Sequence, residues 1–396
     1  MLKRKTSTQA TVESATRLDP AQIPLALYIH LPWCVRKCPY CDFNSHAAET
    51  VPEAQYVAAL LADMEHDLPL TLERPLLSIF LGGGTPSLFS GAAINALLRG
   101  IAHRLPFAPN IEITLEANPG AVDEAHFAGY REAGVNRLSI GVQSMRQAQL
   151  TKLGRVHGTE DAARAVAVAQ AAGFENLNLD LMYGLPGDRK GDSLRDLEAL
   201  LAFAPRHVSW YQLTLEPGTA FAHRPPRLPP EGRIAEEAEQ GVALLAAAGF
   251  NRYEVSAYAQ AGHQARHNLN YWQFGDYLGL GAGAHGKLST AEGVLRTTRR
   301  LHPQAYMKEA DSATVRTLEP VPSARLPIEF MLNALRLAEG FAETLFAERT
   351  GLPVSKLLPA VETAVERGWM SRHEGWLAAT PLGYRFLDDL QLLFLP

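Results

Sequence analysis

The sequence predicts an α/β protein, with a partial (β/α) barrel followed by a mainly helical C-terminal domain that resembles a winged helix. Between about residues 24 and 255, short apolar runs alternate with amphipathic helical patterns. Several of these helices end in Ala-Gly and lead straight into the next apolar run, as a helix C-cap does. This alternation predicts right-handed βα units and a parallel sheet, with the functional site on the loops that follow the strands.

Each predicted strand is a short apolar run bounded by turn residues, and each predicted helix lies between two such runs. The strands are expected at residues 25–31, 77–81, 111–116, 137–142, 177–182 and 208–215, with a weaker one at 253–256. The helices are expected at residues 53–67, 92–103, 125–133, 160–172, 194–203 and 234–248. Six or more such units favour a full or partial barrel over an open doubly wound sheet.

The character of the chain changes near residues 296–327, which predicts a barrel domain at 23–295 and a helical domain at 296–396. In the second domain we expect helices at 326–337, 342–350, 353–367 and 381–393, and short strands at 369–371 and 376–378. Residues 321–396 contain seven Lys and Arg against nine Asp and Glu. This net negative charge disfavours binding to phosphate groups, so we expect a packing or docking domain.

Composition narrows the class of protein. The chain has 396 residues, 47% of them hydrophobic, and a formal net charge of −5. These values are typical of a globular protein and argue against a nucleic-acid binder. No apolar run approaches the 18 or so residues that span a bilayer, and the polar residues 1–22, expected as a flexible tail, lack the apolar core of a secretory signal. We therefore expect a cytoplasmic protein.

The three cysteines of the chain, Cys34, Cys38 and Cys41, lie together directly after the first predicted strand. An odd, clustered set is no disulfide framework, so the C-x3-C-x2-C spacing indicates a metal site. A [4Fe–4S] cluster normally takes four cysteine ligands, and three leave one iron open for chemistry. Zinc, with His30 or His46 as the fourth ligand, is the alternative.

This motif on the first loop of a βα barrel resembles the radical S-adenosylmethionine (SAM) superfamily. The resemblance implies that the open iron binds SAM and that Tyr40 packs beside the adenine. It further implies that the glycine-rich turn at 82–84 binds the methionine ammonium, Glu116 the ribose, and Arg155 the methionine carboxylate. The implied SAM-binding residues are Tyr28, Tyr40, Gly83, Gly84, Thr85, Glu116, Gln143, Arg155 and Asp180.

The chemistry that the superfamily implies begins with a reduced cluster. An electron passes to the sulfonium of SAM, which splits into methionine and a 5′-deoxyadenosyl radical. The protein positions the bond that breaks and excludes water and oxygen. The resemblance assigns no catalytic side chain beyond the cofactor ligands.

The order of the motifs narrows the resemblance to the oxygen-independent coproporphyrinogen III oxidases and the HemW-type heme chaperones. The oxidases carry a further cysteine two residues after the third, where this chain has Phe43, and a longer arm than the 33 residues that precede Cys34 here. Both departures weigh against oxidase activity.

The segment His267-Asn268-Leu-Asn-Tyr271-Trp272 resembles the heme-binding signature of the chaperone branch. An imidazole can ligate heme iron, and aromatic rings offer flat apolar faces to a porphyrin. The resemblance makes His267 the expected ligand, with Asn268, Tyr271 and Trp272 beside the heme. On residue chemistry alone, a helix start with aromatic rings packed in the core remains the alternative.

Together these features predict a heme chaperone that binds heme and transfers it to apo-hemoproteins, on a scaffold carrying a [4Fe–4S] cluster and SAM. The alternative is an oxygen-independent coproporphyrinogen III oxidase, which converts two propionates to vinyls by oxidative decarboxylation. A zinc-stabilised scaffold without enzymatic activity is a third possibility. The expected partners are heme, apo-hemoprotein recipients and an electron donor, with no nucleic acid and no transmembrane segment; peripheral membrane association stays open.

Overall fold

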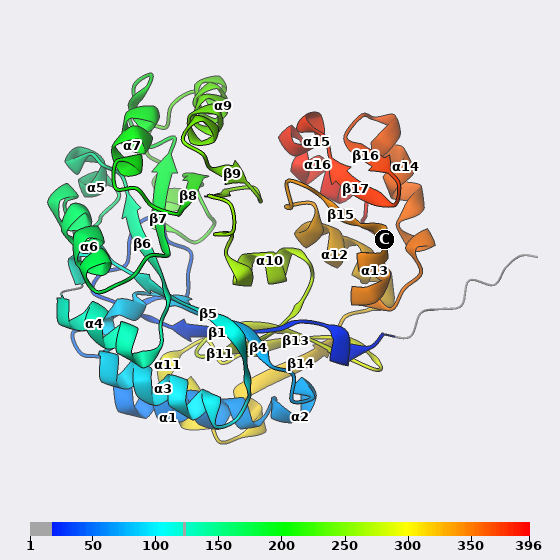
Figure 1. Ribbon diagram of the computed structural model, residues 1–396, viewed down its shortest axis with the longest axis horizontal. Helices are drawn as coiled ribbons and strands as arrows, with labels where there is room; N and C mark the ends of the chain where they lie inside the picture. The colour runs from blue at the N-terminus through cyan, green and yellow to red at the C-terminus, as the bar shows by residue number, and fades with distance from the viewer. Residues whose placement is uncertain (1–17, 122–123) are drawn as a thin grey trace, which may run out of the picture.

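A computed structural model describes residues 18–121 and 124–396 and shows an α/β fold. Its main sheet has twelve strands in the order β14-β13-β12-β11-β1-β4-β5-β6-β7-β8-β10-β9. The sheet curves strongly without closing, and helices cover its outer face (Figure 1). The predicted partial barrel is confirmed.

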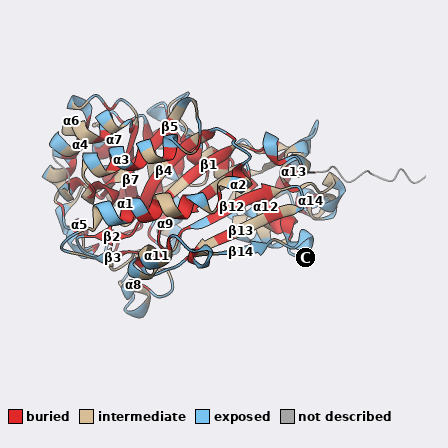
Figure 2. Cartoon of the chain, turned by 90° about the horizontal axis from the view of Figure 1, so that it is seen from below, coloured by how far each residue is buried: buried red, intermediate tan, exposed pale blue. Residues whose placement is uncertain are grey.

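The central strands are parallel and follow one another in sequence, as βα units require. They are β1 (Leu25–Leu31), β4 (Leu76–Gly83), β5 (Phe107–Ala117), β6 (Arg137–Gln143), β7 (Leu177–Tyr183) and β8 (His207–Gln212). β11 (Asp276–Leu280) pairs parallel to β1 on its other side. Nearly every residue of β1 and β6 is buried, because both faces of a parallel sheet are covered (Figure 2).

The helices between these strands are amphipathic and pack their apolar sides on the sheet. The longer ones are α1 (Glu53–Glu65), α3 (Gly91–Ala102), α4 (Glu124–Ala133), α6 (Thr159–Ala171), α7 (Asp192–Leu201) and α9 (Glu231–Ala247). Short helices α2 (Leu68–Thr71), α5 (Gln147–Lys152) and α8 (Ala220–His223) lie in the connections. Gly134, Gly173 and Gly249 follow three of the helices with φ between 83° and 104°, so each supplies the left-handed residue that ends a helix.

The sheet extends beyond the predicted barrel at both edges. One edge adds the antiparallel strands β12 (His285–Thr290), β13 (Gly293–Arg299) and β14 (Arg316–Pro320). The other adds β10 (Ala257–Ala259) and β9 (Asn251–Arg252) where a single strand at 253–256 was predicted. The domain boundary predicted at residues 295 and 296 therefore falls inside β13, and the sheet continues to Pro320.

A buried ion pair explains why the segment after residue 295 stays with the barrel. The Arg299 guanidinium lies 3.1 Å from Asp63 of α1, and both side chains are fully buried. Tyr306, on α11 (Pro303–Glu309), donates a hydrogen bond of 2.8 Å to the same carboxylate. These contacts bind β13 and α11 to the first helix of the barrel.

The C-terminal domain is mainly helical, as predicted, with a small three-stranded sheet. Its elements are α12 (Leu326–Ala334), β15 (Phe341–Ala342), α13 (Glu343–Thr350), α14 (Leu358–Glu366), β16 (Met370–His373), β17 (Trp376–Ala379), α15 (Pro381–Arg385) and α16 (Leu387–Leu392). The predicted helix 381–393 is two helices, because the chain leaves the helical conformation at Phe386. Phe330, Phe341 and Phe346 pack edge to face in a separate core.

The start of the described chain packs against this second core. Leu18 and Ile23 are buried there, so the last part of the expected tail is anchored at Leu18. The rest of that tail, residues 1–17, lies outside the described part of the chain. Among the described residues, no helix is long and apolar enough to cross a membrane.

Candidate functional site

The three cysteines lie on the loop that follows β1. Cys34 belongs to the short strand β2 (Trp33–Cys34), which pairs parallel with β3 (His46–Ala47) and so closes the base of the loop. Within the loop, the Cys41 amide donates to the Cys38 carbonyl at 3.2 Å, which forms a turn. The pairing of β2 with β3 thus brings the two ends of the loop together and keeps all three thiols on it.

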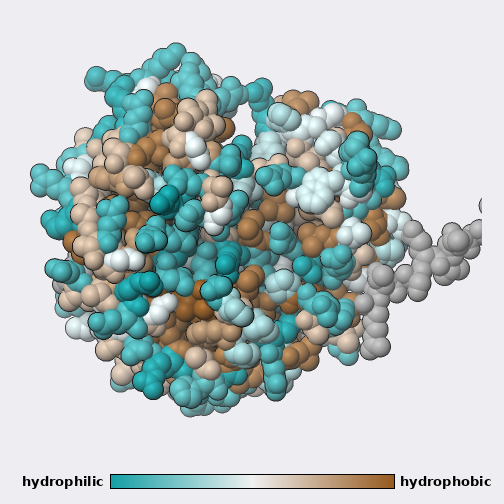
Figure 3. Space-filling model, in the orientation of Figure 1, coloured by the Kyte–Doolittle hydropathy of each residue, from teal (hydrophilic) through white to brown (hydrophobic). Residues whose placement is uncertain are grey.

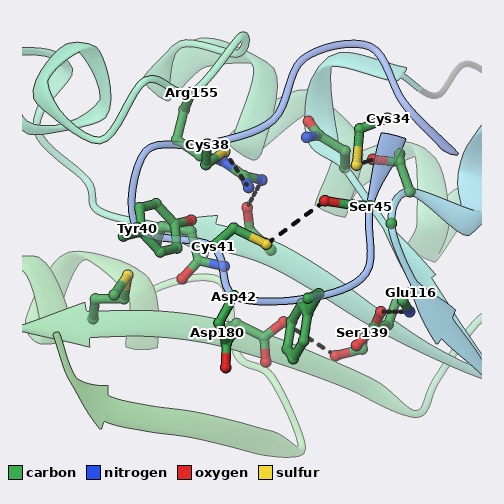
Figure 4. A pocket seen from close by; sticks show the side chains of 18 of the residues that line it. Cys34, Cys38, Tyr40, Cys41, Asp42, Ser45, Glu116, Ser139, Arg155 and Asp180 are labelled. Atoms are coloured by element: carbon green, nitrogen blue, oxygen red, sulfur yellow. Dashed lines mark hydrogen bonds between the residues drawn. The ribbon is translucent and has the colours of Figure 1, made fainter. Parts of the chain in front are cut away.

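Each thiol lies beside a polar side chain, as Figure 4 shows. Thr85 donates to Cys34 at 3.5 Å, Arg155 donates to Cys38 at 3.9 Å, and Ser45 lies 4.0 Å from Cys41. Burial raises the pKa of the Cys34 thiol. Polar neighbours of this kind stabilise thiolates, the form in which cysteine binds metal.

A cavity of about 370 Å³ opens beside the loop, at the carboxyl ends of the parallel strands. Eight of the nine predicted SAM-binding residues line it: Tyr40, Gly83, Gly84, Thr85, Glu116, Gln143, Arg155 and Asp180. Tyr28 does not line it; its hydroxyl lies 2.8 Å from the Nδ1 atom of His30, and its ring stacks on Phe80. The structure therefore brings together all the predicted residues except Tyr28.

The glycines at the end of β4 allow the chain to approach this cavity closely. Gly83 has φ +112°, and a Cβ atom there would lie 2.6 Å from the His30 ring. At Gly84 a Cβ atom would lie 2.5 Å from the backbone oxygen of Trp33. Only glycine fits at either position, so β1 and the end of β4 can pack closely beside the cavity.

Burial raises the pKa of two acidic side chains of the cavity. Burial, reinforced by the charge of Asp180, raises the pKa of Glu116 to about 8, against one hydrogen bond from the Gly83 amide that lowers it. Burial also raises the pKa of Asp180, which accepts hydrogen bonds from Asn178 at 2.7 Å and Ser139 at 3.2 Å. A protonated Glu116 can donate a hydrogen bond as well as accept one.

Several cavity residues escaped the sequence analysis, although strand periodicity could have identified some of them. Ser139 of β6 and Met182 of β7 were missed; they lie two residues from Gly141 and from the predicted Asp180, and so share the inward face of each strand. Tyr211 of β8 donates to the Gln143 side chain at 2.6 Å. No local pattern in the sequence indicates that contact, because it joins residues of two different strands.

The donor groups fit an iron–sulfur cluster better than a single zinc ion. Both ring nitrogens of His30 are engaged, by the Tyr28 hydroxyl and by the Asn44 carbonyl, each at 2.8 Å. The Nε2 atom of His46 lies 3.0 Å from the Asn44 side-chain oxygen. Among the described residues, no three His, Cys, Asp or Glu side chains converge to hold one metal ion. The loop thus offers three thiols, and His30 is not free to complete a zinc site.

The predicted heme motif lies on helix α10 (Arg266–Trp272), away from this cavity. His267 is only 6% exposed; its Nδ1 atom lies 3.1 Å from Glu112, and its ring stacks on Phe80 with the centroids 4.3 Å apart. The Asn268 amide donates to the Tyr253 hydroxyl at 2.9 Å. Both residues therefore face the barrel.

The two aromatic residues of the motif pack in other directions. Tyr271 meets the Tyr277 ring edge to face at 4.7 Å. Trp272 packs against the core of the C-terminal domain, and the Arg336 guanidinium lies 4.3 Å from its ring centroid. Figure 1 shows α10 between the barrel and the C-terminal domain, and Figure 3 shows hydrophobic residues at the centre of this face of the molecule. The motif thus links the two domains.

Comparison with family models identifies both parts of the chain. Residues 28–204 match the radical SAM superfamily, and residues 321–386 match the HemN C-terminal domain. The second match begins directly after β14, where the sheet ends. It therefore agrees with the extent of the sheet.

Curated relatives match over nearly the whole length. A heme chaperone HemW of Escherichia coli is 47% identical over 94% of this chain and 98% of its own. One of Haemophilus influenzae is 45% identical over 95% of this chain and 99% of its own. The chain belongs to the HemW family. The radical SAM match of this chain implies a [4Fe–4S] cluster and SAM as its cofactors.

A solved structure supports the fold of this HemW family member. The coproporphyrinogen III oxidase HemN of Escherichia coli superposes with a TM-score of 0.79 over 98% of this chain and 93% of its own. The two are 20% identical in sequence, so the likeness concerns the fold. Both the barrel and the helical C-terminal domain are therefore shared.

Proposed function

We propose that this protein binds heme and transfers it to apo-hemoproteins, on a scaffold that holds a [4Fe–4S] cluster and SAM. The observation that carries the proposal is the match of 47% identity to a heme chaperone over 94% of the chain. An alignment of that extent includes the cysteine loop, the cavity, helix α10 and the C-terminal domain. No one domain alone accounts for it.

Cys34, Cys38 and Cys41 would hold the cluster, and the cavity residues would hold SAM. When bound, this pair supplies one-electron chemistry. The protein contributes the geometry: the Gly83–Gly84 turn lets the backbone approach the ligand, and Arg155, which donates to the Gly141 carbonyl at 2.9 Å, offers a guanidinium to a carboxylate. Glu116 and Asp180, both deep in the cavity, would meet hydroxyl groups of the nucleoside.

Helix α10 would contribute the heme site through His267, Asn268, Tyr271 and Trp272. The Nε2 atom of His267 has no hydrogen-bond partner among the described residues, yet it is not one of the polar atoms sealed from solvent. An imidazole with one nitrogen paired and the other open suits a metal ligand. Trp272 connects the same helix to the C-terminal domain.

No observation favours the oxidase as a second function. Phe43, at the position where the oxidases carry a further cysteine, is 58% exposed and lies at the rim of the cavity. The likeness to HemN shows the fold and not the reaction. The electron donor, the apo-hemoprotein recipients and a cytoplasmic location belong to the proposal.

The test starts with anaerobic reconstitution of the purified protein with iron and sulfide, followed by parallel assays of heme binding and coproporphyrinogen conversion. We expect about four iron and four sulfide per chain, stoichiometric heme and no porphyrinogen turnover. Single Cys→Ala substitutions at 34, 38 and 41 should each abolish the cluster, whereas the exposed neighbour Asp42→Asn should retain it. Zinc at one per chain without sulfide, or protoporphyrinogen formation, would contradict the proposal.

A further inference from the structure

Three nitrogen atoms at the N-terminus of helix α10 contact a single carboxylate oxygen. The Oε1 atom of Glu112 accepts hydrogen bonds from the backbone amides of Arg266 at 2.9 Å and His267 at 3.3 Å. The Nδ1 atom of His267 lies 3.1 Å from the same oxygen. The side chain of His267 is 8% exposed and that of Glu112 is 7% exposed, so water competes little for these contacts.

The chemistry of these contacts fixes which nitrogen of His267 carries the proton. Backbone amides can only donate, so Glu112 Oε1 acts as an acceptor toward both of them. An imidazole nitrogen that meets the same acceptor must donate as well. Nδ1 therefore carries the hydrogen, and Nε2, which has no partner among the described residues, carries the lone pair.

The ring is also fixed in orientation. Phe80 stacks on one face of His267 with an interplanar angle of 28°, and Tyr271 meets the ring at 77°. Phe80 in turn lies against Tyr28 at 6.1 Å, so the stack rests on β1 and β4 of the barrel. The imidazole is thus held by Phe80 of β4, by Glu112 of β5 and by Tyr271 of its own helix.

We propose that Glu112 is the positioning residue of His267, holding its Nδ1–H so that the Nε2 lone pair is presented to heme iron. The inference rests on the proposed function, because it assumes that His267 is the heme ligand. A carboxylate behind a ligating histidine fixes the tautomer and increases the electron donation of the ring to the metal. Glu112 adds a fifth residue to the four of the heme motif, 155 positions earlier in the chain.

The first test uses the heme-free, full-length protein labelled with ¹⁵N in its histidine rings. His267 is assigned by its absence from the spectrum of His267→Ala. We expect a protonated Nδ1 and an unprotonated Nε2 in the wild type and in Glu112→Gln, whose amide oxygen still accepts. Glu112→Ala should give a mixture of tautomers. A protonated Nε2 in the wild type would overturn the inference whatever the heme binding.

The second test measures heme binding and the reduction potential of the bound heme. Glu112→Gln removes the charge and keeps the acceptor, so the potential should rise while binding persists; Glu112→Ala should weaken heme binding at least tenfold. Glu237→Gln is the matched control, because Glu237 is another buried carboxylate that accepts from a backbone amide, at Gly191. An unchanged potential in Glu112→Gln would refute the role of Glu112. Wild-type heme affinity in His267→Ala would instead refute the heme ligand of the proposed function.

Discussion

Two glutamates on strand β5 lie toward opposite ends of the barrel, and their surroundings shift their pKa values in opposite directions. Glu112 and Glu116 are four residues apart, a rise of roughly 13 Å, and share one face of the strand. Burial raises the pKa of both. At Glu112 the hydrogen bond from His267 and the charge of Arg137 outweigh burial, and the pKa falls to about 2. At Glu116 the neighbouring Asp180 adds to burial, and the pKa rises to about 8.

The difference is one of hydrogen-bond donors. Glu112 meets the N-terminus of a helix and an imidazole, so its charge is matched. Glu116 accepts one amide hydrogen bond and faces a second acid. At the α10 end of the barrel the charge of Glu112 is thus matched, whereas at the cavity end no cation among the described residues pairs with Glu116. Without such a partner, burial keeps Glu116 largely protonated, a form that can donate a hydrogen bond to a hydroxyl group.

Replacing Glu112 by Ala should have the largest effect on stability. The substitution leaves the amides of Arg266 and His267 and the imidazole without their buried acceptor, which should cost about 4 kcal/mol of unfolding free energy. Urea unfolding at pH 7 measures the loss. Glu112→Gln, which keeps the acceptor, should lose less than half as much. Equal losses in the two variants would show that charge alone is responsible.

Glu116 should make the free energy of unfolding fall as the pH rises. Its pKa of about 8 in the folded state exceeds the ordinary value of 4.5, so the folded protein binds a proton that the unfolded chain releases. Stability should therefore fall as the pH rises from about 5 to 8, by roughly 3 kcal/mol. Unfolding of Glu116→Gln over this range should lack that fall. A decline that is the same in both proteins would assign it to other groups.

A smaller loss of stability is expected when the link between α10 and the C-terminal domain is removed. Arg336 lies over the Trp272 ring and pairs with Glu254 at 2.9 Å, and Glu254 is 3% exposed. Arg336→Ala should cost about 2 kcal/mol and speed proteolysis between the domains. Iron and sulfide content should stay at the wild-type level, because the cluster loop lies at the other end of the barrel. A loss of cluster would show that the two ends are coupled.

The smallest effect is expected at Ser139. Ser139→Ala removes one donor to Asp180 and one acceptor for Asn178, which should cost about 1 kcal/mol. The loss should be measured against Ser209→Ala, since Ser209 donates to the Asn178 side-chain oxygen in the same network. If Ser139→Ala lost more unfolding free energy at pH 8 than Glu116→Gln, then Asp180 and not Glu116 would be the acid that controls stability at the cavity end of the barrel.

Much of this architecture could be predicted from the sequence because its signals are local. Apolar runs mark the strands, Gly134 and Gly173 mark helix ends, and the cysteine spacing marks the loop. Eight of the nine predicted SAM residues meet in one cavity, because strand ends meet at one edge of a parallel sheet. Tyr28 does not join them, because its side chain turns toward Phe80 inside the barrel.

Contacts between distant segments could not be predicted in the same way. Glu112 and His267 are separated by 155 residues, and nothing around either residue indicates the other. Strands β12 to β14 escaped prediction because polar residues such as Lys287 and Thr297 interrupt their apolar pattern. Both are buried, and Lys287 pairs with Asp276 of β11. Protonation states such as that of Glu116 depend on the assembled site.

The unclosed sheet leaves two rims with free backbone groups, a hazard for any β-structure because a second chain can add to them. Here both rims are poor templates for such growth. β9 offers only two residues, and β14 has five, with Arg316 and Glu319 on it and Pro320 at its end. Proline lacks the amide that a further strand requires, and charged side chains on an edge strand are costly to cover with another chain. The sheet can thus stay open at both rims without offering a template for aggregation.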